Sequence, residues 1–189
     1  SFYGDGVVAL TGSTDYYSTK YKYVYDSVTF QKDYKRVPDT TAIPEFLAEL
    51  KANAILERMQ KNDLLITADT IVWKDDAAIG KPTSYSEAKQ MLFGLSGHMH
   101  EVITSVCFTS QNYQKTIHDT TKVWFKTLTE AEIEYYLDNY KPYDKAGSYG
   151  VQEWLGYIAI DRLEGSYFNV MGLPTRLVYK TLLELSEKS

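Results

Sequence analysis

The stretch of sequence that decides the fold is Leu64-Leu65-Ile66-Thr67-Ala68-Asp69-Thr70. Its first five residues form a nearly continuous apolar run, which is typical of a buried strand. The strand is expected to end at Asp69, and ligands of α/β sheets bind beyond the ends of strands. There the Asp69 carboxylate can hold a metal ion or accept a proton from water, or it can cap the strand end by accepting backbone hydrogen bonds.

Strand-like and helix-like segments alternate on both sides of this stretch, and the alternation indicates an α/β fold. Apolar and β-branched runs predict further strands at residues 7–10, 21–25, 101–109, 120–127 and 157–160. Apolar residues at spacings of three and four predict helices over residues 43–59, from Ser84 to Gly94 or Gly97, after Thr129, and from Pro174 onward.

Short polar signals mark where these helices begin. Ser84 with Glu87, and Thr129 with Glu132, have the spacing of a capping box, in which the first side chain accepts a hydrogen bond from the backbone of the second residue. Pro44 suits the first turn of helix 43–59. The predicted apolar face of that helix, beside which Lys51 lies, consists of Phe46, Leu47, Leu50, Ala54 and Ile55.

Length and composition limit the classes of function. The 189 residues predict one domain, 1–189, with room for two lobes. A net charge of -5 argues against a nucleic-acid polymer as partner, whereas a small anionic ligand needs only a few cations. No apolar run approaches the roughly 20 residues that span a bilayer, and residues 1–6 lack the basic and apolar regions of a signal peptide, so we expect a cytoplasmic protein without a membrane partner. Cys107, the single cysteine, lies in an apolar run and is expected to be buried and inert.

Glycine-containing turns carry further candidates for a ligand site. A hairpin is predicted from residues 71–73, the acidic turn after them and Gly80-Lys81-Pro82, and it would return Lys81 towards Asp69. The alternative is that Lys81 is solvated, as a lysine in a turn commonly is. Lys145 precedes Ala146-Gly147, where small residues let a phosphate chain approach the backbone. The amide of Gln152 can recognise the edge of a base or can simply lie on the surface.

The three histidines predict no metal centre. His100 opens a strand after a Ser-Gly turn, a setting typical of a structural histidine, and its neighbour Glu101 does not change that interpretation. His98 and His118 do not complete a metal-binding spacing.

From about residue 43 to its end, the chain resembles the Maf family of nucleoside triphosphate pyrophosphatases. The resemblance rests on Leu47-Ala48 with Lys51-Ala52, Ala68-Asp69-Thr70, Gly80-Lys81-Pro82, Met91-Leu92 with Leu95-Ser96-Gly97 and His100, residues 144–152, and residues 165–174. Segment 145–152 is similar to the branch that acts on dTTP and UTP, not to the branch that prefers 7-methyl-GTP. The resemblance implies a mixed, twisted central sheet flanked by helices, elongated with a cleft, as in ITPase and Maf-like proteins.

The resemblance also implies a reaction and a site. Asp69 would be the catalytic proton acceptor and metal ligand, and Thr70 and Gln152 would select the base. The lysines that would face the triphosphate are Lys51, Lys81 and Lys145. The implied reaction is hydrolysis between the α- and β-phosphates with a divalent cation, Mg²⁺ or Mn²⁺, as cofactor. A homodimer is compatible with the resemblance.

One loop departs from the family pattern. The first strand of the family runs into Ser-x-Ser-Pro-Arg-Arg, whereas this chain reads Leu10-Thr11-Gly12-Ser13-Thr14-Asp15-Tyr16-Tyr17. Arginine offers phosphate a fixed cationic fork, which tyrosine and aspartate do not replace. The acidic residue that the family places soon afterwards is also missing from its usual setting, with Asp33 the nearest substitute. The alternative function is therefore a nucleotide-binding module with weak or no catalysis.

Overall fold

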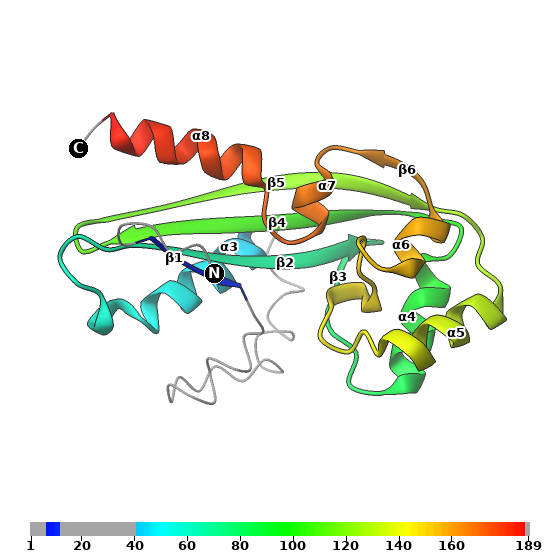
Figure 1. Ribbon diagram of the computed structural model, residues 1–189. Helices are drawn as coiled ribbons and strands as arrows, with labels where there is room; N and C mark the ends of the chain where they lie inside the picture. Colours follow the sequence, from blue (N-terminus) through cyan, green and yellow to red (C-terminus); the bar gives the residue numbers. More distant parts are fainter. Residues whose placement is uncertain (1–6, 12–40, 188–189) are drawn as a thin grey trace. The chain divides into compact units, whose positions relative to one another are not determined.

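The computed structural model describes residues 7–11 and 41–187, and it confirms an α/β fold with a mixed sheet (Figure 1). The order of strands is β1 (Val7–Thr11), β2 (Leu64–Lys74), β4 (Met99–Ser110), β5 (Tyr113–Phe125) and β6 (Ile160–Glu164), and β3 (Ala77–Ile79) pairs with β2. β1 runs parallel to β2, whereas the β2–β3 and β5–β6 pairs are antiparallel. The predicted strand 21–25 and the loop after Thr11 lie outside the described residues.

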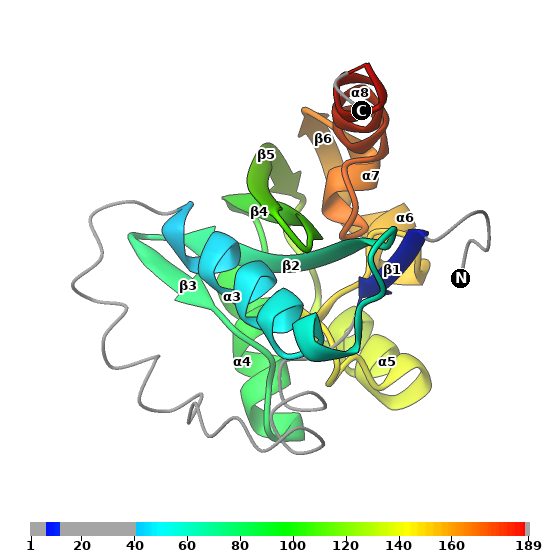
Figure 2. The ribbon, with the colours of Figure 1, turned by 90° about the vertical axis from the view of Figure 1, so that its left-hand side faces the viewer.

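The four predicted helices begin close to their predicted starts, whereas α6 (Trp154–Ala159) and α7 (Tyr167–Val170) were not predicted. The predicted α-helices are α3 (Ala42–Asn53), α4 (Tyr85–Leu95), α5 (Glu130–Tyr140) and α8 (Thr175–Ser186), and short 3-10 turns occur at η2 (Leu56–Arg58) and η3 (Ala146–Ser148). Two views show α4 and α5 side by side (Figures 1 and 2). Among the described helices, none is both long enough and apolar enough to cross a membrane.

Both predicted caps form, with one difference. At α5, Thr129 accepts from the Glu132 backbone N–H and the Glu132 carboxylate accepts from the Thr129 N–H, which completes the capping box. At α4, Ser84 accepts from the Glu87 N–H, but the Glu87 carboxylate accepts from the N–H and hydroxyl of Thr83. The cap residue was therefore predicted correctly, and the return bond reaches one residue further back.

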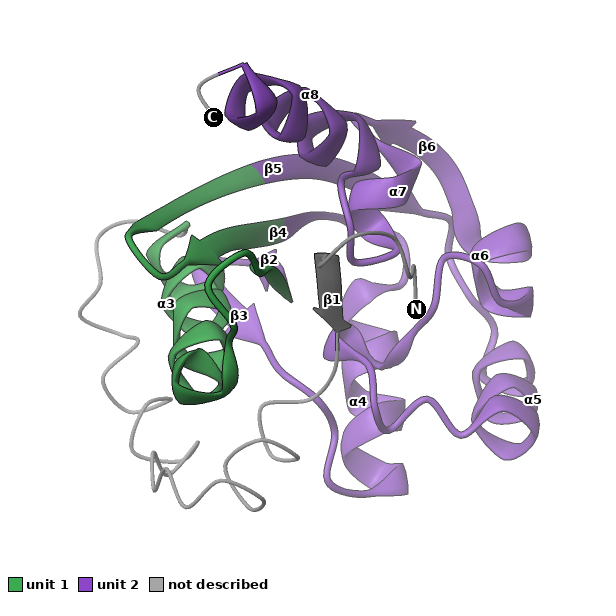
Figure 3. Cartoon of the chain, turned by 60° about the vertical axis from the view of Figure 1, so that its left-hand side comes forward, with its two compact units in different colours: residues 1–69, 104–118 green, residues 70–103, 119–189 purple. Residues whose placement is uncertain are grey.

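The chain forms two compact units (Figure 3). The first unit comprises residues up to 69 and residues 104–118, and the second comprises residues 70–103 and 119–189. Strand β2 passes from the first unit to the second at Asp69 and Thr70, so these neighbouring candidates belong to different units.

The first unit has a small core in which α3 packs on strand residues. Ala48 and Ala52 of α3 contact Leu65 and Cys107, and all four are buried. The Thr67 hydroxyl donates to the Ala48 carbonyl at 2.6 Å, which ties β2 to the helix backbone. Cys107 is buried as predicted, and burial raises the pKa of its thiol, which disfavours the reactive thiolate.

The second unit contains the larger core. Apolar side chains from β2, β4 and β5 pack against helices α4, α5 and α6 in one continuous cluster. The fully buried side chains Leu92, Leu95, Ile133 and Leu137 form the contact surfaces of α4 and α5. Tyr149 and Val151 of the loop at residues 144–152 belong to the same cluster, so the packing also fixes this loop.

Three sequence predictions were wrong in detail. β2 continues to Lys74, so Asp69 lies inside a strand and not at its end, because Ile71 and Val72 continue the buried pattern. Residues 157–160, predicted as a strand, belong mostly to α6, whose Leu155 and Ala159 bury one helical face. The third difference is that α3 ends at Asn53 and not at Met59.

The buried face of α3 also differs from the predicted apolar face. The buried residues are Ile43, Pro44, Ala48, Lys51 and Ala52, whereas the predicted face of larger apolar residues is only partly buried. A buried lysine is unfavourable without a partner, so its position in this face requires a specific acceptor on the sheet.

Candidate functional site

Asp69 and Lys51 form a buried ion pair in the first unit. The Lys51 Nζ lies 2.5 Å from the Asp69 Oδ1 and donates a second hydrogen bond to the Ala68 carbonyl at 2.7 Å. The lysine side chain is 2% exposed and that of Asp69 is 13% exposed. Lys51 therefore holds the carboxylate in one orientation, and the partial exposure of Asp69 leaves part of it accessible to a ligand.

The donor set around Asp69 suits one type of cation. Across residues 7–11 and 41–187, no group of three or more histidine, cysteine, aspartate or glutamate side chains is arranged to hold a metal. Mg²⁺ commonly binds one or two protein carboxylates and completes its coordination with water and substrate phosphates. Asp69 fits a cation that arrives with a polyphosphate, and does not fit a cation held entirely by protein.

Lys81 and Lys145 lie on two segments that a backbone hydrogen bond joins in the second unit. The Gly147 N–H donates to the Gly80 carbonyl at 3.0 Å, one residue before Lys81 and two residues after Lys145. The predicted hairpin forms through the β2–β3 pairing and leads directly into Gly80. The fold thus brings together two of the predicted phosphate-facing lysines, although they are separated by more than sixty residues.

Lys145 lies between two carboxylates. Its Nζ is 2.9 Å from the Asp144 Oδ1 and 3.1 Å from the Glu153 Oε1. Burial alone would lower the pKa of Lys145, but the hydrogen bonds to both acids outweigh it and raise the pKa. Burial would likewise raise the pKa of Asp144, but Lys145 and the more distant Lys81 hold it below its ordinary value. Lys145 is therefore a permanent cation at neutral pH.

The two residues predicted to select the base both belong to the second unit. The Gln152 side chain is exposed, and its backbone carbonyl accepts a hydrogen bond from the Tyr157 hydroxyl at 2.7 Å. Thr70 is half-buried on β2, and a Cβ added to Gly172 would lie 3.4 Å from the Thr70 Oγ1. An exposed amide on a turn braced by Tyr157 is available to a ligand.

His100 is a core residue. Its Nε2 lies 2.7 Å from the Tyr149 hydroxyl, and its ring packs edge-on against Phe125 and Tyr149. Burial, and to a smaller extent the charge of Lys74, lower the pKa of His100 to about 4. The ring is therefore neutral at pH 7 and brings no positive charge to a phosphate, which agrees with the structural role expected from its sequence position.

Acid should destabilise the protein through His100. An unfolded histidine titrates near pH 6.5, so between about pH 6.5 and pH 4 the unfolded chain binds a proton that the folded chain does not. His100 alone should lower the free energy of unfolding by about 3 kcal/mol as the pH falls over this interval. The stability that the neutral ring contributes is fully present only above pH 6.5. Urea unfolding at pH 7, 5.5 and 4 measures the fall, which should be much smaller in His100→Gln than in the wild type. The matched control is His98→Gln, at an exposed position, and an equal fall in both variants would contradict the assignment.

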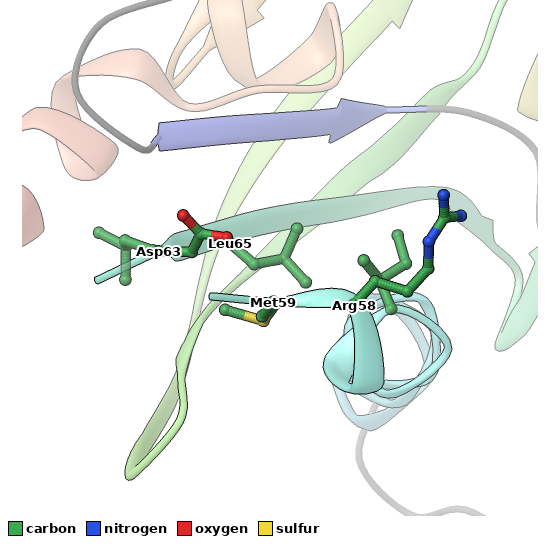
Figure 4. A pocket seen from close by; sticks show the side chains of 6 residues that line it. Arg58, Met59, Asp63 and Leu65 are labelled. Atoms are coloured by element: carbon green, nitrogen blue, oxygen red, sulfur yellow. The ribbon is translucent and has the colours of Figure 1, made fainter. Parts of the chain in front are cut away.

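A pocket in the first unit is lined by none of the predicted site residues. Its lining is mainly apolar and consists of Ile55, Arg58, Met59, Asp63, Leu64 and Leu65 (Figure 4). Asp63 accepts a hydrogen bond from the Gln60 backbone N–H, so its carboxylate already stabilises a turn. A pocket with this lining lacks the cluster of cations that a triphosphate requires.

Sequence reasoning missed two residues at the Lys145 cluster. Glu153 follows Gln152 directly, and Tyr136 forms part of the apolar face of α5, where an aromatic residue indicates only core packing. The Tyr136 hydroxyl donates to the Glu153 Oε2 and accepts from the Gly150 N–H at 3.1 Å. No local pattern relates Tyr136 to the loop, because the contact depends on how α5 packs.

Comparison with known sequences identifies the family. The sequence pattern of the family described as Maf-like protein matches residues 18–185, which is most of the chain. The chain belongs to the Maf-like family. The resemblance noted in its motifs is thereby confirmed, and the mixed α/β architecture of this Maf-like chain agrees with it.

Several relatives of this Maf-like chain carry the same name, dTTP/UTP pyrophosphatase. The protein of Christiangramia forsetii is 57% identical over 143 residues, which cover 76% of this chain and 73% of the relative. The Bacteroides fragilis protein is 50% identical over 151 residues, 78% of each chain. The Porphyromonas gingivalis protein is 48% identical over 160 residues, 84% of this chain and 80% of the relative.

Proposed function

We infer that this protein hydrolyses dTTP and UTP to the nucleoside monophosphate and pyrophosphate. The observation that carries this conclusion is the identity of 48 to 57% to several relatives named dTTP/UTP pyrophosphatase over most of their length. The hydrogen bond between Gly147 and Gly80 joins the segments that carry Lys81, Lys145 and Gln152, and these side chains are consistent with a nucleotide substrate.

In this proposal Asp69 accepts the proton of the attacking water. A carboxylate held by a buried ammonium group keeps a fixed orientation, so the oxygen that takes the proton is positioned before the substrate binds. Lys51 is almost fully buried and bonded to Asp69, so we propose that it contributes to triphosphate chemistry by orienting that carboxylate.

A divalent cation is part of the same proposal. Asp69 would be its protein ligand, and when bound the cation would neutralise charge on the phosphate oxygens.

Lys81 and Lys145 are proposed to bind the phosphates, and Thr70 and Gln152 to select the base. An ammonium group at hydrogen-bond distance from a phosphate oxygen offsets the negative charge that develops on the leaving pyrophosphate. The Gln152 amide can donate to and accept from one base edge together, which matches the paired donor and acceptor of uracil and thymine. The homodimer that the resemblance allows stays a prediction.

The reaction can be tested on the purified full chain with dTTP and UTP in Mg²⁺ or Mn²⁺, in water enriched in ¹⁸O. We expect equal amounts of monophosphate and pyrophosphate, with the heavy oxygen in the monophosphate if water attacks the α-phosphorus. Removal of the cation with EDTA should abolish release, and added Mg²⁺ or Mn²⁺ should restore it. Chromatography and mass spectrometry of the products give both measurements.

Two results would contradict the proposal in different ways. Formation of a nucleoside diphosphate and inorganic phosphate would show cleavage at the other anhydride bond. Tight binding of UTP or dTTP by calorimetry without turnover under either cation would instead favour the nucleotide-binding module suggested by the altered loop after Leu10.

A further inference from the structure

The two carboxylates that hold Lys145 differ in how firmly they are held. Asp144 is the residue next to Lys145 in the chain, and its side chain is 73% exposed. Glu153 is only 20% exposed, and it reaches Lys145 from the N-terminal boundary of α6. An exposed carboxylate can rotate into water at little cost, whereas a largely buried one with a second partner cannot.

The second partner of Glu153 is Tyr136. The Tyr136 ring is fully buried in the core of the second unit, where its neighbours fix its position. Burial, and then the hydrogen bond to Glu153, raise the pKa of Tyr136 far above its ordinary value. The hydroxyl therefore keeps its proton and donates a hydrogen bond to the carboxylate. The same hydroxyl accepts from the Gly150 N–H at 3.1 Å. One core residue thus holds both Glu153 and the backbone two residues before Gln152.

The loop backbone packs directly on this ion pair. A Cβ added to Gly150 would lie 2.9 Å from the Glu153 Cδ and 3.1 Å from the Lys145 Cε, closer than side chains normally approach. A larger residue at this position would therefore displace the side chains of the lysine and the glutamate. The positions of Lys145, Glu153 and the loop are therefore interdependent.

We propose that Glu153, held by Tyr136, is the fixed anchor of Lys145, and that Asp144 is the exchangeable partner that a phosphate of the substrate displaces. Glu153 and Tyr136 are then positioning residues that act through Lys145. The inference rests on the proposed function in taking a nucleotide phosphate as the ligand of Lys145, and it adds unequal roles for two acids at nearly equal distances from one ammonium group.

The test compares Glu153→Gln with Asp144→Asn, which remove the same charge from the same lysine. Loss of the anchor should raise the Kd for inorganic pyrophosphate and the KM for UTP by about tenfold, because a neutral amide holds the Lys145 ammonium group less firmly than a carboxylate and lets it sample other positions. Loss of the exchangeable partner should lower both constants by about threefold, because the phosphate then displaces no competing charge. Isothermal titration calorimetry with pyrophosphate and steady-state kinetics with UTP measure the two constants.

Two further variants complete the experiment. Tyr136→Phe should change both constants in the same direction as Glu153→Gln, and it carries the test alone if Glu153→Gln does not fold. Glu134→Gln removes the charge of a carboxylate that lies 2.7 Å from the Lys89 Nζ in the same unit, and it should leave both constants unchanged. Thermal unfolding of each variant separates a loss of binding from a loss of fold.

Opposite shifts in Glu153→Gln and Asp144→Asn support the anchor, because a purely electrostatic effect would move both constants downward. If the wild type cleaves UTP but Kd and KM shift in the same direction in both variants, the anchor is overturned and the proposed function stands. A wild-type protein that neither cleaves UTP nor binds pyrophosphate overturns the proposed function, and the anchor with it.

Discussion

Replacement of Asp69 by asparagine is expected to lower kcat/KM for dTTP and UTP by about 1,000-fold, because an amide cannot accept the proton of the attacking water. Asparagine keeps the shape of the side chain and can still accept a hydrogen bond from Lys51, so the local geometry should survive. Release of pyrophosphate, measured below the unfolding temperature of the variant, gives the comparison.

The matched control is Asp76→Asn, on the turn between β2 and β3. Asp76 is exposed and has a positive φ of 57°, a conformation that asparagine tolerates well. Its replacement should leave turnover within about twofold of the wild-type value, as for an exposed residue away from special features. Undiminished release of pyrophosphate by Asp69→Asn would remove Asp69 from the mechanism.

Breaking the Lys51–Asp69 pair should cost about 3 kcal/mol of the free energy of unfolding, whichever partner is removed. Asp69→Asn leaves an ammonium group that is 2% exposed without a counter-charge, and Lys51→Met leaves a largely buried carboxylate. The double variant, Lys51→Met with Asp69→Asn, contains no isolated buried charge. It should therefore be no less stable than either single variant, which corresponds to a coupling energy of about 3 kcal/mol.

Urea unfolding followed by circular dichroism measures all four proteins of this cycle. The comparison cycle is Lys89→Met with Glu134→Gln, whose side chains are 24% and 46% exposed. A pair with that exposure should couple by less than about 1 kcal/mol. Additive effects at Lys51 and Asp69 would mean that the pair does not hold the sheet and α3 together.

Local signals predicted the starts of helices and the hairpin well. Ser84 and Thr129 cap their helices as predicted, because a capping side chain bonds to a backbone group only three residues away. The Gly80-Lys81-Pro82 segment follows the β2–β3 hairpin for a similarly local reason. Features that depend on neighbours in sequence are the ones that a single sequence defines best.

Predictions that depended on tertiary contacts were less successful. Asp69 was expected to end a strand because the apolar run 64–68 stops there. A carboxylate inside a strand is costly, and the ammonium group of Lys51 that offsets this cost comes from a helix, eighteen residues earlier in the chain. Residues 157–160 have few polar positions, so a short buried helix and a strand could not be told apart by periodicity.

The candidate site was also predictable where it depends on local sequence and not where it depends on tertiary contacts. The residues of the site came from a resemblance in short motifs, whereas the anchor formed by Glu153 and Tyr136 depends on the packing of α5 against the loop. Residues 12–17, which stand where the family has its arginine pair, lie outside the described residues.

The hydrogen bond from the Gly147 N–H to the Gly80 carbonyl uses main-chain atoms alone. Every residue except proline has an amide N–H, so exchanging side chains in either segment leaves this donor and acceptor in place, except at Gly147, where a Cβ would lie 2.9 Å from a methyl group of Val72. Laboratory evolution towards other bases could therefore vary Gln152 and its surroundings while the two lysine-bearing segments stay joined. Proline at position 147 is the one replacement of that residue that removes the donor itself, and it would release the segments from each other.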